Sequence, residues 1–242
     1  MATTGKAMRP ANLASDARRS RRLALGLRRL GWPEESIGRF LETAELITFP
    51  RGRVIYREGS AATRLYWMLD GVAKLFVPGS LGRRVLVSLA KPGALLGSHL
   101  VVGGRRLDTA IALTPIHAAA IDMVEFQDIV RELPVDVTAL MTRGTLDYYS
   151  RTFLRTVKLL TLDLRGKLAL GLLDLAEGFG VAEAQGRLVK VRLTHEDLAE
   201  LTGISRARVT KTIAEFSEQG LVVRRGRDLV VRVRELREVA GF

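Results

Sequence analysis

Side chains suited to binding a nucleic acid gather at the start of one predicted helix, within residues 193–222. Val209, Ile213 and Phe216 recur at three- and four-residue spacing and define the buried face of that helix. The opposite face carries cations that can donate to guanine, while capping hydroxyls and backbone N–H groups can hold phosphates. The DNA-binding side chains predicted in this segment are Thr194, Ser205, Arg206, Arg208, Thr210 and Lys211.

The residues before this helix predict that it is the second helix of a helix-turn-helix motif. Thr194 and Asp197, three residues apart, form a capping box that begins a first helix. Gly203 makes the turn, and Ser205 caps the second helix, whose end fits the major groove of DNA. This agreement of caps, turn and cations favours DNA recognition over a helical hairpin in an unrelated core.

A predicted β-hairpin follows the helix-turn-helix, in the sequence LVVRRGRDLVVRV. Gly226 lies at its tip, and Arg224, Arg225 and Arg227 surround it, so the hairpin is expected to be a wing that contacts the DNA backbone. Residues 187–242 hold twelve basic and eight acidic side chains. With so modest an excess, binding should depend on where the cations lie more than on bulk charge.

Composition narrows the function classes. The 242 residues carry a formal charge of +12 and no cysteine, which excludes disulfides, thiolate metal sites, iron–sulfur clusters and cysteine nucleophiles. The three histidines and the absence of hydrolase, metalloprotease and phosphate-loop motifs predict neither an enzyme nor a metal site. No apolar run is long enough for a membrane span and no signal-peptide core is present, so a cytoplasmic protein is expected, without a membrane partner.

The N-terminal segment holds most of the charge excess. Residues 1–30 contain eight basic side chains and one acidic side chain, Asp16, and so supply +7 of the +12. This segment is either a solvated tail leading into a first helix or an arm that contacts nucleic acid. Its basic residues are Lys6, Arg9, Arg18, Arg19, Arg21, Arg22, Arg28 and Arg29.

The chain divides into four predicted segments of an α+β protein. Residues 1–45 form the basic tail and short helices, and residues 46–135 form an effector-sensing domain. Short β-branched and aromatic runs, separated by turns such as Asp70-Gly71, predict that this domain is an antiparallel β-roll, a double-stranded jelly roll. Residues 136–162 form a long helix, and residues 163–242 form the winged helix-turn-helix domain.

The long helix carries one apolar stripe, formed by Leu146, Tyr149, Phe153, Val157 and Leu160. The stripe could pack on the chain's own roll, but a helix of about seven turns exceeds what one small roll can cover, which favours a two-helix dimer interface. Asp163 is a plausible N-cap for the next helix, so a hinge is expected near Leu162–Asp163.

Roll, long helix and winged helix in this order resemble the cyclic AMP receptor protein / fumarate-nitrate reduction regulator (CRP/FNR) family of bacterial transcription factors. The resemblance covers residues 46 to 236 and rests on RLYWMLDGVAKLF, LTLDLRGKLA and above all LTHEDLAELTGISRARVTKTI. It implies that the roll is cyclic-nucleotide-binding-like. It also implies a homodimer that binds near-palindromic double-stranded DNA and contacts RNA polymerase.

In this family, three exposed positions of the second helix read bases, and they fall on Arg206, Ala207 and Lys211. The middle position is usually Glu, which accepts from cytosine. Ala207 cannot accept a hydrogen bond, although its methyl group could lie against the methyl of thymine. The half-site is therefore expected to differ from the common family consensus, with Arg208 and Thr210 as candidates for a substitute base contact.

The resemblance also places an effector pocket at Gly97, Ser98, Arg105, Arg106, Asp108, Thr109 and Thr152. Cyclic-nucleotide binders have Glu after the first glycine, and Arg eleven residues beyond that glycine. Here Ser98 lacks the carboxylate for the ribose, and Asp108 would set an anion against the phosphate. Arg105 and Arg106 could hold a phosphate only through a shifted loop.

Several functional alternatives stay open. The effector could be cyclic AMP, another small molecule such as a larger nucleotide or an organic acid, or absent, and haem bound through His99 or His117 is a further option. The leading hypothesis is a homodimeric, allosteric, sequence-specific DNA-binding regulator. The alternatives are an effector-independent regulator and a sensory module that acts through protein contacts, although a protein-contact face normally lacks such a cluster of cations.

Overall fold

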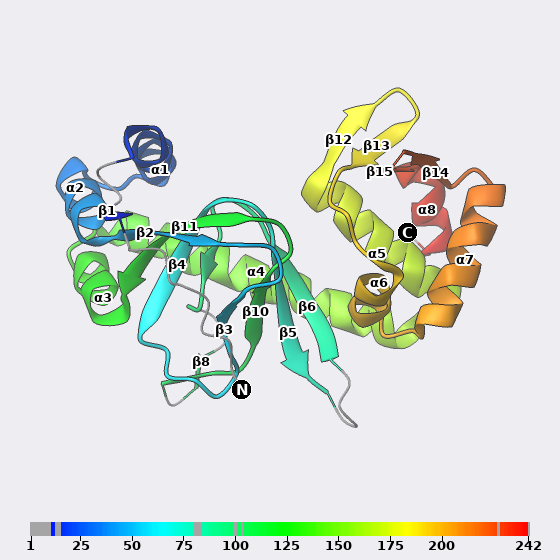
Figure 1. Ribbon diagram of the computed structural model, residues 1–242, viewed down its shortest axis with the longest axis horizontal. Coiled ribbons are helices and arrows are strands. Elements are labelled where there is room, and N and C mark those ends of the chain that lie inside the picture. Colours follow the sequence, from blue (N-terminus) through cyan, green and yellow to red (C-terminus); the bar gives the residue numbers. More distant parts are fainter. Residues whose placement is uncertain are drawn as a thin grey trace. The chain divides into compact units, whose positions relative to one another are not determined.

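The computed structural model describes residues 11–12, 16–79, 84–98, 101–102, 104–226 and 228–241. Lys6, Arg9, His99 and Arg227, to which the sequence assigned candidate roles, lie outside these residues. The chain divides into two compact units: residues 1–80 with 87–149, and residues 81–86 with 150–242. The architecture is the predicted α+β one, with a β-rich first part, a long helix and a C-terminal helix-turn-helix (Figure 1).

The first unit contains a β-roll made of two facing groups of strands. One sheet has the order β1 (Ala11–Asn12), β2 (Glu45–Phe49), β11 (Ile116–Asp122), β4 (Arg64–Asp70) and β7 (Leu95–Leu96). Another has the order β3 (Val54–Tyr56), β10 (Thr109–Ala112), β5 (Ala73–Pro78) and β6 (Arg84–Ala90). A short pair, β8 (Val101–Val102) and β9 (Arg105–Arg106), precedes β10.

Strand β4 divides its side chains between two cores because successive residues of a strand point to opposite faces. Met68 packs inside the roll with Phe49, Ile55 and Ile116. Leu65, Trp67 and Leu69 alternate with it and face a helical layer instead. The sheet of β2, β11 and β4 is therefore covered on both faces, and its strands are apolar on both sides.

The helical layer consists of α1 (Ala17–Arg29), α2 (Glu34–Thr43) and α3 (Met123–Arg131), which gather beside this sheet in Figure 1. Leu23 and Leu27 of α1 are buried in the same cluster as Trp32 and Phe40. Trp32, Phe40, Trp67 and Phe126 contact one another at ring centroid distances of 6.1 to 6.5 Å. From Ala17 onward, the basic N-terminal segment is thus a helix with a buried face.

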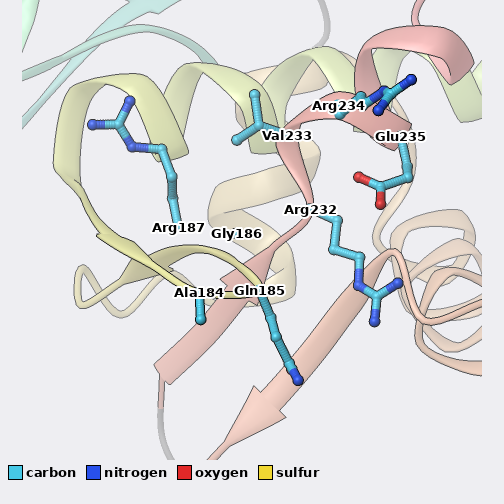
Figure 2. A pocket seen from close by; sticks show the side chains of 8 residues that line it. All are labelled: Ala184, Gln185, Gly186, Arg187, Arg232, Val233, Arg234 and Glu235. Carbon is cyan, nitrogen blue, oxygen red and sulfur yellow. The ribbon is translucent and has the colours of Figure 1, made fainter.

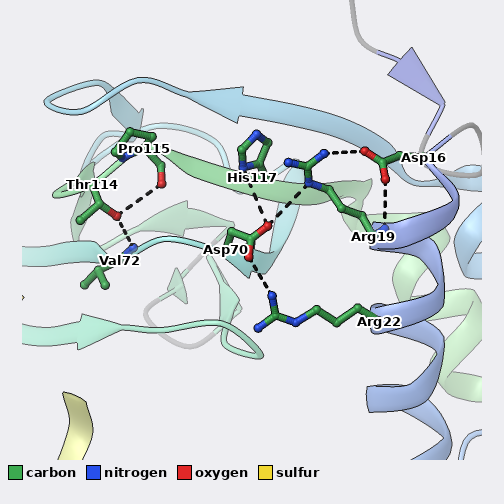
Figure 3. Close-up of polar contacts among 8 residues, drawn as sticks. All are labelled: Asp16, Arg19, Arg22, Asp70, Val72, Thr114, Pro115 and His117. Atoms are coloured by element: carbon green, nitrogen blue, oxygen red, sulfur yellow. Dashed lines mark hydrogen bonds and ion pairs between the residues drawn. The ribbon is translucent and has the colours of Figure 1, made fainter. Parts of the chain in front are cut away.

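Two arginines of α1 bind the turn between β4 and β5 (Figure 3). Arg22 Nη1 lies 2.8 Å from Asp70 Oδ1, and Arg19 Nε lies 3.6 Å from Asp70 Oδ2. The turn itself depends on Gly71, whose φ is +88°, because an added Cβ would lie 2.3 Å from the carbonyl oxygen of Pro115. Two of the basic residues of the N-terminal segment, Arg19 and Arg22, therefore form ion pairs within the folded domain.

The long helix α4 (Val135–Thr161) begins after Pro134, as predicted, and spans the division between the units. Its apolar stripe is exposed: Phe153 and Leu160 keep 68% and 77% of their surface. Asp163 caps α5 (Leu164–Phe179), with its Oδ1 accepting from the N–H of Gly166 at 2.7 Å, which confirms the predicted N-cap. Helix α5 ends at Gly180, its C-cap residue.

The second unit surrounds α5, whose residues Leu168, Leu172 and Leu175 are buried. Helices α6 (His195–Thr202), α7 (Arg206–Glu218) and α8 (Val233–Val239) pack against it. Strands β12 (Gly180–Glu183), β13 (Gly186–Val189), β15 (Asp228–Val231) and β14 (Val222–Arg225) form an antiparallel sheet in that order. This is the winged helix-turn-helix that the sequence predicted.

Candidate nucleic-acid interface and effector site

The start of α6 is fixed by the predicted capping box. Thr194 Oγ1 accepts from the N–H of Asp197 at 3.1 Å, and Asp197 Oδ2 accepts from the N–H of Thr194 at 2.8 Å. Gly203 adopts the left-handed conformation, with φ of +72°, and ends the helix. Thr194 therefore has a demonstrated structural role, in addition to the DNA contact predicted for it.

Helix α7 presents its predicted polar side chains to solvent. Ser205 Oγ accepts from the N–H of Arg208 at 3.4 Å and caps the helix. Val209, Ile213 and Phe216 are buried, as predicted, so the other face turns outward. Exposed residues of this outward face are Arg206, Ala207, Arg208, Thr210 and Lys211.

The two described arginines of the wing, Arg224 and Arg225, differ in their contacts. Arg225 Nη1 forms an ion pair with Glu183 of β12 at 2.7 Å, so this predicted DNA contact already has a protein partner. Arg224 is exposed, and no side-chain partner for it occurs among the described residues. Of the two described wing arginines, Arg224 is therefore the more available for DNA. Arg227 lies outside the described part of the chain.

His195, the first residue of α6, is a site residue that was not predicted from the sequence. Its Nδ1 lies 2.8 Å from Thr210 Oγ1 on α7, which links the two helices of the motif. Burial lowers the pKa of the His195 imidazole, and the charges of Arg224 and Arg206 lower it further. His195 therefore lies close enough to the recognition helix and the wing to sense the cations of both.

In the β-roll, Arg106 fills the space beside Gly97, the first residue of the predicted pocket. Arg106 is 97% buried, and its guanidinium donates to the carbonyl oxygens of Gly97, at 3.4 Å, and of Arg64. Its central carbon lies 4.0 Å from the centroid of the Tyr56 ring, a cation–π contact. Gly97 has φ of +85°, and an added Cβ would lie 2.1 Å from Arg106 Nη1.

Asp108 belongs to the same buried cluster. Only 2% of its surface is exposed, and its Oδ2 accepts from the hydroxyl of Tyr56 at 3.0 Å. Burial raises the pKa of the Asp108 carboxyl, while the Tyr56 hydrogen bond and the charge of Arg106 oppose the shift. Burial also raises the pKa of the Tyr56 hydroxyl, and Asp108 raises it further. The charges of Arg106 and Asp108 thus compensate each other inside the roll.

The other predicted pocket residues of the roll form hydrogen bonds of their own. Arg105 is exposed and donates through Nη1 to the carbonyl oxygen of Gly59 at 2.8 Å. Thr109 Oγ1 accepts from the N–H of Glu58 at 3.1 Å, and Ser98 Oγ donates to the carbonyl oxygen of Leu95 at 3.2 Å. Thr152 lies on the part of α4 that belongs to the second unit. Arg105 and Arg106, the two arginines predicted as possible phosphate ligands, therefore both donate hydrogen bonds to backbone carbonyls.

An open depression lies elsewhere, between the β12–β13 turn and the start of α8 (Figure 2). Arg187, Arg232, Arg234 and Glu235 line it together with smaller residues. None of the residues predicted from the sequence for DNA or effector binding lies in it.

The described residues offer no group of three or more His, Asp or Glu side chains that could hold a metal ion. His117, the described haem candidate, lies with its Nδ1 4.0 Å from Asp70 Oδ2, beside Arg19 (Figure 3). None of the described helices is both long enough and apolar enough to cross a membrane.

Comparison with known proteins assigns both halves of the chain to families. Residues 46–132 match the cyclic nucleotide-binding domain, and residues 166–239 match the Crp-like helix-turn-helix domain. The chain is 27% identical over 202 residues to the CRP-like cAMP-activated global transcriptional regulator of Mycobacterium tuberculosis, which covers 83% of this chain and 90% of that protein. It is 28% identical over 178 residues to the Global nitrogen regulator of Synechocystis sp., covering 72% of this chain and 79% of that protein.

The solved structure of FixK2 from Bradyrhizobium japonicum has the same fold. Its TM-score is 0.69 at 20% sequence identity, over 82% of this chain and 98% of that one.

Proposed function

The chain belongs to the CRP/FNR family of transcription regulators, and from this premise we propose that it is a homodimer that binds a near-palindromic DNA site. The observation that carries the proposal is the outward face of α7, where Arg206, Arg208 and Lys211 are exposed at a capped helix end. A helix end with free cations fits the major groove, and Arg224 on the wing adds a contact to the backbone.

The dimer would form through α4. Its exposed apolar stripe is too large to be left to solvent in a single copy, and a second copy would bury it by two-fold symmetry. In the dimer, residues 136–162 act as the dimerisation helix, residues 46–135 as the sensory roll and residues 163–242 as the DNA-binding domain. Two recognition helices then lie about one DNA turn apart, ~34 Å.

The roll is proposed to control DNA binding without binding cyclic AMP in the standard mode. Asp108 stands where cyclic-nucleotide binders have the arginine that binds the phosphate. Arg106 contacts backbone carbonyls and the Tyr56 ring instead. An anionic nucleotide would have to displace these contacts, whereas another small effector could use different residues of the roll. Tyr56, Arg106 and Asp108 bind one another and the backbone without a ligand. This observation favours a second candidate function, a regulator that needs no effector.

RNA polymerase in the cytoplasm is the further partner proposed for a protein of this kind. A protein-contact module remains the weaker alternative because the cations of α7 suit DNA better than a protein surface.

Selection of random double-stranded DNA by the purified protein tests the proposal, at ~0.1–0.15 M salt with no nucleotide added. A two-fold symmetric enriched sequence is the expected result. A parallel selection with the Arg206→Ala/Lys211→Ala variant should lose that sequence. If nothing is enriched, the selection is repeated with cyclic AMP, cyclic GMP and cyclic di-GMP, and failure with a folded dimer in every case contradicts DNA recognition.

A further inference from the structure

His195 lies where the recognition helix and the wing meet, and its hydrogen bonding leaves one ring nitrogen available. Nδ1 lies 2.8 Å from Thr210 Oγ1, and no partner of Nε2 occurs among the described residues. The residue is half-buried, and Nε2 is the ring nitrogen left without a partner among the described residues. This residue was not among those assigned to DNA binding above.

The Thr210 hydroxyl determines which ring nitrogen carries the proton. A hydroxyl has a single hydrogen, and Thr210 Oγ1 donates it to the carbonyl oxygen of Arg206 at 3.0 Å. The hydroxyl must therefore accept from His195, which places the neutral proton on Nδ1. Nε2 then holds the lone pair and is the atom that gains a proton when the ring becomes charged. Protonation leaves the bond to Thr210 intact, because Nδ1–H donates in both states.

Burial, and after it the charges around His195, lower the pKa of the ring in the free protein. Arg206 faces it from α7 and Arg224 faces it from β14, and both oppose a positive imidazolium. The carboxylates nearest in sequence, Glu196 and Asp197, lie on its own helix, and Asp197 is held by Thr194. A polyanion that covers Arg206 and Arg224 would neutralise their repulsion and would favour a charged ring.

We propose that His195 is a further residue of the DNA interface, which binds a backbone phosphate through protonated Nε2, so that DNA binding takes up a proton. The inference rests on the proposed DNA-binding function and names a regulation of that same surface. Because a phosphate contact carries no sequence information, the effect extends to any duplex. DNA affinity is expected to rise as the pH falls, within the window between the pKa of the free ring and the higher pKa of the bound ring.

The composition makes this proton uptake measurable. The chain has three histidines and no cysteine, so few groups titrate between about pH 5.5 and 8. Uptake of one proton changes the dissociation constant by at most about tenfold per pH unit. A total gain of about three- to tenfold from pH 8 to pH 6 is expected for one partly exposed histidine.

The test measures binding of a fluorescent mixed-sequence duplex of about 30 base pairs by anisotropy, at a fixed ~50 mM ionic strength from about pH 5.5 to 8. The wild-type protein should bind more tightly at low pH. His195→Asn retains a donor for Thr210 but cannot gain the proton, so its affinity should match wild type at pH 8 and stay flat. His195→Arg, with a permanent charge, should bind tightly at every pH. His117→Gln, in the roll, should retain the wild-type slope.

A second readout separates a DNA contact from a purely structural role. NMR titration of the imidazole of His195, assigned by its loss in His195→Asn, should give a higher pKa with the duplex bound than in the free protein. A wild-type curve that is flat with pH, or a slope that persists in His195→Asn, overturns the inference while leaving DNA binding in place. Absence of binding to the duplex at every pH overturns the proposed function and the inference with it.

Discussion

Arg155 and Asp174 form an ion pair that joins the last turns of α4 to α5. The same guanidinium donates through Nη2 to the backbone carbonyl of Leu201, in α6, at 2.7 Å. Burial raises the pKa of the Asp174 carboxyl, and the charge of Arg155 opposes that shift. A single side chain thus connects the proposed dimerisation helix to two helices of the DNA-binding domain.

Arg155→Met should destabilise the second unit by about 1–3 kcal/mol, because it leaves the half-buried Asp174 carboxylate and the Leu201 carbonyl without their donor. Urea unfolding followed by circular dichroism measures this change. Arg151→Met, at an exposed position of the same helix, is the matched control and should stay within about 0.5 kcal/mol of wild type. Equal losses in the two variants would contradict the role assigned to Arg155.

Leu160→Glu should convert the protein from a dimer to a monomer, because it places a charge on the exposed apolar stripe of α4. Sedimentation velocity gives the oligomeric state directly. Leu25→Glu makes the same change at another exposed leucine, on α1, and should remain dimeric. A Leu160→Glu dimer as stable as wild type would mean that the stripe is not the interface.

Lys211→Ala should relax specificity at one base pair of the half-site, at a cost of about 1–3 kcal/mol for the preferred base. Arg224→Ala should instead weaken binding to all sequences alike and reduce the salt dependence of the affinity, because a wing cation contacts phosphates. Repeating the DNA selection with each variant distinguishes the two outcomes. A uniform loss for Lys211→Ala would show that it binds only the backbone.

Ala207→Glu should introduce a preference for cytosine at the base facing that position, since a carboxylate accepts from the cytosine amino group. Enrichment of the same half-site by wild type and variant would place Ala207 away from the bases. Ala207→Ser, which adds a short hydroxyl that can either donate or accept, serves as the size control and should change the preference less.

Asp108→Asn should gain stability relative to wild type as the pH rises from the ordinary pKa of an aspartate, 3.8, towards neutrality. The pKa of the Asp108 carboxyl is raised above its ordinary value of 3.8, chiefly by burial. The stability contributed by the neutral acid is therefore present at low pH and lost as the pH rises through the folded-state pKa, whereas asparagine stays neutral throughout. Urea midpoints at the two ends of this pH range measure the gap.

The helix-turn-helix could be predicted from the sequence because its determinants are local. Thr194, Gly203 and Ser205 specify caps and a turn within a few residues of where they act, and the buried face of α7 follows from helical spacing. The contact of His195 with Thr210 was missed because it joins residues on two helices. Its only sequence signal was a histidine at the first position after the predicted cap.

Strand β11 was not predicted from the sequence, although it lies at the centre of its sheet. Its run Ala118–Ala120 has low intrinsic strand preference, and pairing with β2 and β4 on either side determines its conformation. The burial of Arg106 was equally hidden, because it depends on Tyr56, fifty residues earlier, and on the backbone of Arg64. Such contacts follow from the tertiary fold and leave no local pattern.

The burial of α1 has a consequence for where the β-roll can be separated from the rest of the chain. The matched cyclic nucleotide-binding segment begins at residue 46, yet Leu23, Leu27, Trp32 and Phe40 fill one side of its central sheet. A truncated chain starting at that boundary would present Leu65, Trp67 and Ile121 to water. The boundary of sequence similarity is therefore not the boundary of an autonomous folding unit, which in this protein extends at least to Ala17.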